Sequence, residues 1–146
     1  MPAVPTDVLQ ITYRADLQVL VARWMRQPST DELQNGYEHL LNVAVEYKCH
    51  TWLIDAGRRA DSNKDRTTWM VQHFFPRLAE RLPGNVHLAF LFTPGHLRDI
   101  ETDPQLPPLS FFGNRPYQVA RFTEEQAAMA WLAEHRQPQT SKQVPV

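Results

Sequence analysis

Residues 52–69, WLIDAGRRADSNKDRTTW, combine an aspartate with a group of cations and could carry chemistry. Asp55 ends the apolar run WLID. Its carboxylate could act as a general base, with His73 or His96 as its companion. It could instead accept hydrogen bonds from the turn AGRR, a common use of aspartate at a strand end. We expect Asp55 to be chiefly structural.

The same stretch carries four cations within nine residues: Arg58, Arg59, Lys64 and Arg66. They lead into a predicted helix start, where unpaired amide donors and forked arginines can bind carboxylate or phosphate. Ligands of α/β sheets tend to lie beyond the carboxyl ends of the strands, which adds residues after the next predicted strand. The candidate ligand or partner site is therefore Asp55, Arg58, Arg59, Ser62, Arg66, Thr93 and His96. Alternatively, nearby aspartates neutralise the cations and the turn is only a solvated charge cluster.

The sequence lacks the motifs of metal sites, phosphate-binding loops and serine or cysteine nucleophiles. The six histidines never adopt a metal-ligand spacing, and the chain has neither a glycine-rich phosphate loop nor a Gly-x-Ser-x-Gly turn. Cys49 is the only cysteine, which excludes an intrachain disulfide and favours a buried thiol. We therefore expect no catalytic residues, no metal and no cofactor.

Composition and charge narrow the classes of partner. The net charge is -1, with 42% hydrophobic and 21% charged residues, so there is no overall basic field for nucleic acid. The longest apolar runs, such as VHLAFLF, are far shorter than the roughly 20 residues of a membrane span, and the first residues do not resemble a signal peptide. We expect a cytoplasmic protein without a membrane span.

The order of the predicted elements indicates an α/β fold. Apolar periodicity predicts strands near 8–13, 17–25, 50–55, 86–92 and 117–122, and helices near 28–47, 65–82, 93–102 and 123–135. The order is β-β-α-β-α-β-(α)-β-α, a mixed β-sheet with an initial hairpin and flanking helices. We expect one domain over residues 8–134, between an N-terminal tail, 1–7, and a C-terminal tail, 135–146.

Several positions in these helices carry specific predictions. Ser29 and Glu32 match a capping box, and Gly36 suggests a close backbone approach to the sheet. Pro76 predicts a kink or a new helix start. In the last helix, the residues expected to face inward are Ala127, Ala128, Trp131 and Leu132.

Three segments, GYEHLL, LIDAGRR and WMVQHFFPRL, together with the element order, resemble the SpoIIAA-like (STAS) family, and within it an uncharacterised bacterial branch. The resemblance covers roughly Val8 to Glu134 and implies a domain that works by binding. Its better known members carry a DSSG motif with a phosphorylated serine. Here Asp61 and Ser62 match the start of that motif, whereas Asn63 and Lys64 replace the rest.

The leading expectation is thus a non-catalytic binding or regulatory module, acting through a protein partner or a small anionic ligand. One alternative is a small enzyme that uses Asp55 with a rim histidine. Another, implied by the relation of the family to the SEC14 fold, is a carrier of lipid or another small ligand with an apolar cavity beneath the second helix. The proline-bearing tails and the aromatic loop LSFFGNRPY suggest a homodimer.

Overall fold

The computed structural model describes residues 7–57, 69–95, 97–98 and 116–135, except for the side chain of Val71. Along the chain its elements are β1 (Leu9–Arg14), β2 (Val19–Trp24), α1 (Thr30–Tyr47), β3 (Thr51–Asp55), η1 (Met70–Phe74), α3 (Phe75–Arg81), β4 (Val86–Leu91), β5 (Tyr117–Phe122) and α5 (Glu125–His135).

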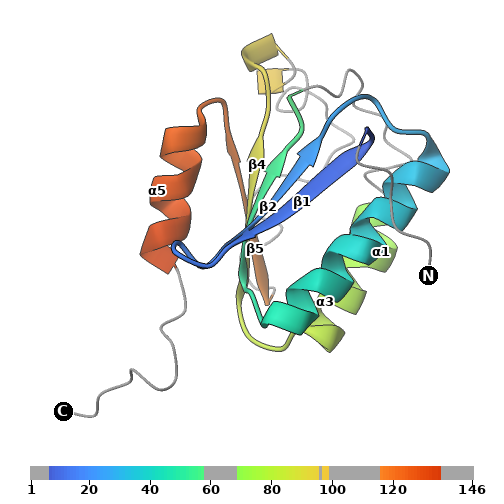
Figure 1. Cartoon of the computed structure of the whole chain (residues 1–146), viewed down its shortest axis with the longest axis vertical. Coiled ribbons are helices and arrows are strands. Elements are labelled where there is room, and N and C mark those ends of the chain that lie inside the picture. Colours follow the sequence, from blue (N-terminus) through green and yellow to red (C-terminus); the bar gives the residue numbers. More distant parts are fainter. Residues whose placement is uncertain (1–6, 58–68, 96, 99–115, 136–146) are drawn as a thin grey trace.

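The strands form one five-stranded mixed sheet in the order β1-β2-β3-β4-β5. β1 and β2 are an antiparallel hairpin, and each later neighbour is parallel. Helices α1 and α3 cover one face of the sheet and α5 covers the other (Figure 1). This arrangement confirms the predicted α/β class with an initial hairpin. In the register, Asp55 is opposite both Arg23 and Leu91, so the carboxyl ends of the parallel strands share one edge.

The short helix expected after β4 is helical wherever its residues are described up to residue 98. Residues 94–95 and 97–98 are helical, and residue 96 lies outside the described part of the chain. The backbone N–H of Leu97 donates to the carbonyl of Thr93 at 2.9 Å, which is a single helical turn. The proline at 94 favours a helix start at this point. Residues 99–115 lie outside the described part.

Helix α1 begins as the sequence predicts. The Ser29 hydroxyl accepts from the backbone N–H of Glu32 at 3.1 Å, and the Glu32 carboxylate accepts from the backbone N–H of Ser29 at 2.9 Å. This reciprocal pair is the expected capping box. Arg26 donates two further hydrogen bonds to the carboxylate, and together with the Ser29 amide it lowers the pKa of Glu32 to about 2.

Gly36 lies where α1 comes closest to the sheet. A Cβ atom at this position would be 2.5 Å from Cη2 of Trp24 and 3.0 Å from Cδ2 of Leu9. Both neighbours are buried in the core. The glycine is therefore retained in a helix, despite its low propensity, because β1 and β2 leave no room for a side chain. This confirms the predicted close approach.

The second helix changes type immediately before Pro76. In η1 the backbone N–H of Phe75 donates to the carbonyl of Met70, five residues earlier, which is a π-helical bond. Pro76 has no N–H to donate, and α3 starts around it with the proline in the first turn. The structure confirms the expected new helix start at this proline.

The buried residues form a large and a small cluster on opposite faces of the sheet. The large cluster joins the sheet to α1, η1 and α3 and includes Trp24, Tyr37, Trp52 and Phe74. The small cluster lies under α5, where Ala128 and Leu132 are fully buried. Trp131 is partly buried, but Ala127 is exposed, so its predicted inward orientation is wrong. Because helical neighbours point about 100° apart, a narrow buried stripe excludes one of two adjacent alanines.

Candidate functional site

Asp55 ends β3, and each of its carboxylate oxygens has a partner. Oδ2 accepts from Nη1 of Arg23 at 2.9 Å, and Oδ1 accepts from the backbone N–H of Gly57 at 3.0 Å. The side chain is only 19% exposed. The bond to Gly57 is the turn contact expected for an aspartate that ends a strand.

Arg23 joins Asp55 to the start of α5. Its Nη1 and Nη2 atoms also donate to Oε1 and Oε2 of Glu125, at 2.9 and 3.2 Å. Hydrogen bonds to Glu125 and then to Asp55 raise the pKa of Arg23 against the opposing effect of burial. These three residues, called here the Arg23 network, tie together β2, β3 and α5. Bidentate pairing of this kind fixes geometry as well as charge.

The sequence analysis missed the Arg23 network because its partners are 32 and 102 residues away from Arg23. The only local signal is an arginine near the end of an otherwise apolar strand, VLVARW. Such a residue at the carboxyl edge of a sheet needs an acidic partner when it is partly buried. That requirement predicts a pair but does not select which carboxylate forms it.

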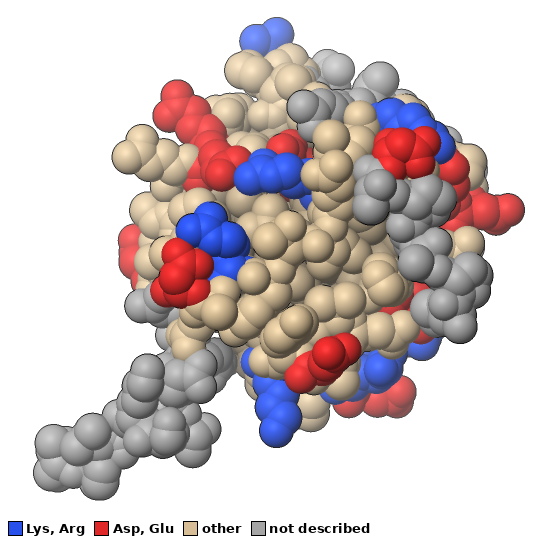
Figure 2. All heavy atoms as spheres, viewed as in Figure 1, with Lys and Arg blue, Asp and Glu red and all other residues tan. Residues whose placement is uncertain are grey.

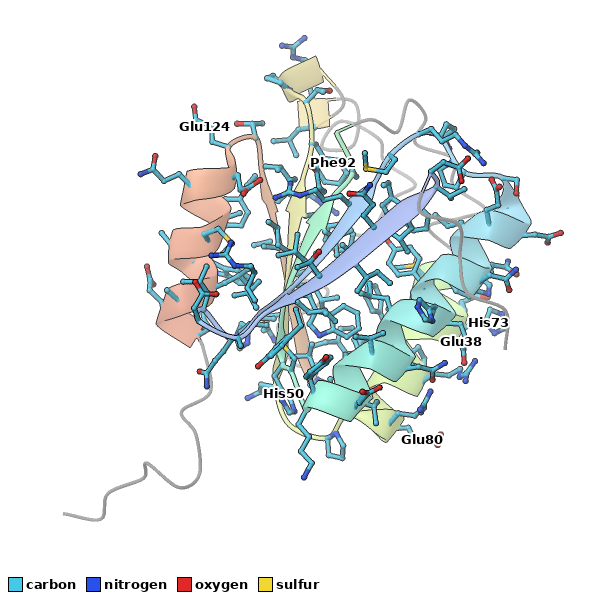
Figure 3. The ribbon with its side chains drawn as sticks, in the orientation of Figure 1. Glu38, His50, His73, Glu80, Phe92 and Glu124 are labelled. Atoms are coloured by element: carbon cyan, nitrogen blue, oxygen red, sulfur yellow. The ribbon has the colours of Figure 1, made fainter. Side chains whose placement is uncertain are left out.

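The expected companion His73 is not joined to Asp55. His73 is exposed on η1 and points away from the sheet on the outer side of the helices, whereas Phe92 marks the carboxyl edge of the strands (Figure 3). The structure therefore pairs Asp55 with an arginine and a backbone amide. His96, the other possible companion, lies outside the described residues.

The whole of the predicted basic turn lies outside the described part of the chain, that is, Arg58, Arg59, Lys64 and Arg66. The candidates Ser62 and His96 also lie outside it. Thr93 is described and is exposed just after β4. Its carbonyl accepts the N–H of Leu97, as given above. A joint anion or partner site formed by these residues and Asp55 stays a prediction.

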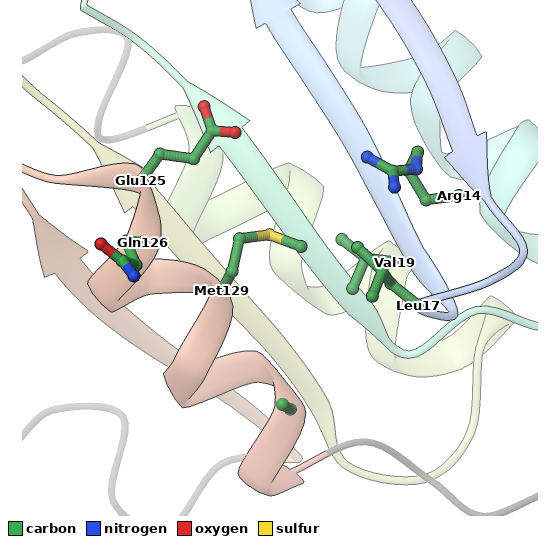
Figure 4. Close-up of a pocket in the computed structure, with 7 residues that line it drawn as sticks. Arg14, Leu17, Val19, Glu125, Gln126 and Met129 are labelled. Carbon is green, nitrogen blue, oxygen red and sulfur yellow. The ribbon is translucent and has the colours of Figure 1, made fainter.

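A groove of about 390 Å³ lies elsewhere, between α5 and the β1–β2 hairpin (Figure 4). Met129 and Ala133 line it from the helix, Leu17 and Val19 from the hairpin, with polar groups from Arg14, Glu125 and Gln126. In the surface view, both signs of charge are spread around a largely neutral central area (Figure 2). This distribution does not mark a strong single-sign binding surface on that face.

Replacing Asp55 with alanine is expected to lower the free energy of unfolding by about 1 kcal/mol, because it removes a turn contact and one arm of a partly exposed ion pair. Asp55→Asn should retain part of this stability, since its amide oxygen can still accept from Gly57. Urea unfolding measures both. Asp16→Ala is the matched control, because Asp16 is 62% exposed in its pair with Arg14. Equal stability of wild type and Asp55→Ala would contradict the structural role.

The described residues offer neither a metal site nor a membrane-spanning helix. Among the described residues, no three side chains of His, Cys, Asp or Glu gather in a way that could hold a metal ion. None of the helices in that part of the chain is long and apolar enough to cross a bilayer. No protein-family model, curated protein or solved structure matched the chain.

Proposed function

We propose that the chain is a non-catalytic binding or regulatory module of the SpoIIAA-like kind, and that it acts through protein–protein interaction. The observation that carries the proposal is the engagement of both Asp55 oxygens, one by Arg23 and one by the Gly57 amide. These contacts use the one carboxylate at the strand edge that the sequence offered for chemistry. On this proposal, a protein partner recognises the surface at the carboxyl edge of the strands.

An enzyme that used Asp55 would need a different arrangement. A general base must lie within hydrogen-bond reach of the proton that it removes. Asp55 is held by Arg23, and His73 points away on the other side of the helices. Catalysis would require this carboxylate to leave two partners before it met a substrate. The present contacts favour a structural carboxylate and hence a binding module.

The alternative of a lipid carrier depends on space beneath the second helix. There the Phe74 ring centre lies 5.0 Å from that of Tyr37 and 6.2 Å from that of Trp52. All three side chains are almost completely buried. Packed aromatic rings thus occupy the region where the carrier would need its cavity, which favours the binding module over the carrier.

The test is affinity capture with the full chain as bait, using Arg58→Glu/Arg59→Glu. Charge reversal in the predicted basic turn should reduce capture of a specific partner by about tenfold or more, since each charge-assisted contact contributes about 1.5–3 kcal/mol. Arg77→Glu/Arg81→Glu makes the same charge change on α3 and serves as the control, with thermal unfolding to check that loss of the Arg77–Glu38 ion pair leaves it folded. Capture should also weaken towards about 1 M salt, where the Debye length is about 3 Å.

Two results would contradict the proposal. Equal capture by wild type and both double variants would remove the basic turn from recognition. Turnover of a substrate that Asp55→Asn abolishes, with stability unchanged, would establish the enzyme instead. A homodimer and a cytoplasmic location remain predictions that accompany this proposal.

A further inference from the structure

Beyond the Arg23 network at its start, helix α5 is held to the sheet by a small set of apolar contacts. It is the only assigned helix in the described part of the chain on its face, whereas α1 and α3 share the other (Figure 1). Its fully buried residues are Ala128 and Leu132, which pack with a few sheet residues such as Leu53 and Ala89. An element with few buried contacts is among the first to open locally. The attachment of α5 is therefore sensitive to small changes at its ends.

The last turns of α5 rest on a histidine of the sheet. The rings of His87, on β4, and His135 are stacked with centroids 4.3 Å apart and planes 15° apart. Trp131 meets His87 edge-on at 5.4 Å. His87 is only 9% exposed, and its buried Nδ1 has no hydrogen-bond partner among the described residues. This contact favours a neutral His87, because a buried imidazolium without an acceptor is costly.

Among the described residues, no acidic side chain acts on His87 to stabilise a positive charge. Its register neighbours on β3 and β5 are Thr51 and Gln118, which are uncharged. The titratable groups that act on it are His135 on α5 and His50 before β3. Burial lowers the pKa of His87, and these two histidines lower it further. Every neighbouring group that could take up a proton thus opposes a charge on His87.

We propose that the contact of buried His87 with His135 makes α5 an acid-sensitive cover, whose last turns leave the sheet when His87 is protonated. Release would uncover the apolar sheet face around Leu53 and Ala89, which α5 now buries. The proposal rests on this histidine contact and is independent of the basic turn.

The direction of the pH dependence follows from proton linkage. The docked state disfavours a proton on His87, so the released state binds more protons. Docking is therefore complete above the ordinary pKa of histidine, and it is lost as the pH falls through that range towards the depressed pKa of His87. Closely stacked imidazolium rings would also repel each other.

Hydrogen exchange of the full chain, at about pH 7.5 and about pH 5.5, tests the proposal. After correction for the pH dependence of unstructured amides, protection of residues 129–135 should fall by about tenfold under acid, a change typical of local opening. Protection of α1 should stay constant and serves as the internal reference. His135→Gln should reduce the fall in α5, because it removes one of the two histidines that oppose a charge on His87, while His73→Gln, the exposed control on η1, should retain the full effect.

Three outcomes would overturn the proposal. Protection of α5 could be equal at both pH values, or α1 and α5 could lose protection together through global unfolding. His135→Gln could also lose protection under acid as much as His73→Gln does. His135 is exposed at the helix end, so its replacement should leave the fold intact and the test readable.

Discussion

Replacing Phe74 with alanine is expected to lower the free energy of unfolding by about 3–5 kcal/mol, the range for truncating a buried phenylalanine. Phe74 is only 1% exposed. Its ring centre lies between 5.0 and 6.2 Å from those of Tyr37, Phe75, Trp69 and Trp52. Alanine would remove this ring from the centre of an aromatic cluster whose rigid neighbours cannot collapse into the gap.

Urea unfolding followed by circular dichroism measures the effect. Phe74→Leu should cost less than Phe74→Ala, because leucine fills part of the volume. Gln72→Ala is the control on the same helix, since Gln72 is exposed and its replacement should change stability by less than about 0.5 kcal/mol. A loss below about 1 kcal/mol for Phe74→Ala would show that the site repacks. Many small domains have only about 5–15 kcal/mol of stability, so the expected loss is large.

Features that depend on neighbouring residues could be predicted from the sequence. The capping box of Ser29 and Glu32 needs only the spacing of two residues, and Pro76 enforces its helix start through its own ring. Burial of Cys49 followed from its chemistry, and its thiol donates to backbone carbonyls while burial raises its pKa. In each case the determining interaction lies within one segment or in the residue itself.

Features that depend on the tertiary arrangement could not be predicted. The Arg23 network joins three elements, and no spacing along the chain distinguishes Glu125 from another carboxylate as the partner of Arg23. The stack of His87 on His135 and the groove beside Met129 arise only when α5 meets the sheet. The exposure of Ala127 was missed for a related reason, because the width of the buried stripe of α5 is set by the sheet beneath it.

At Asp55, one contact depends on neighbouring residues and the other depends on the tertiary arrangement. The sequence left Asp55 open to a catalytic or a structural role, and its position at a strand end favoured the second. The contact to Gly57 agrees with that expectation, but the arginine that holds the other oxygen comes from a different strand. The local part of the role was predictable, while its charge partner was a product of the fold.

Gly36→Ala is expected to lower the free energy of unfolding by about 2 kcal/mol. Overpacking a close contact costs up to about 3 kcal/mol, and the better helix propensity of alanine returns about 1 kcal/mol. The added Cβ would lie 2.5 Å from Cη2 of Trp24, a ring that is fully buried and also packs against Tyr37. Neither the helix nor the ring can move aside without disturbing the core.

Two further variants separate the contact with Trp24 from a general effect of removing glycine. Gly95→Ala is the control, because no described atom lies within 4 Å of a Cβ built there, so it should be neutral or raise stability by up to about 1 kcal/mol through helix propensity. Trp24→Phe removes the ring atoms nearest to Gly36, and in that background Gly36→Ala should cost at least about 1 kcal/mol less. If Gly36→Ala lowers the free energy of unfolding by the same amount in the Trp24→Phe background, another neighbour causes the effect. Leu9 would be the first to test. A gain in stability from Gly36→Ala alone would contradict the prediction. It would show that the space between α1 and Trp24 can hold a methyl group.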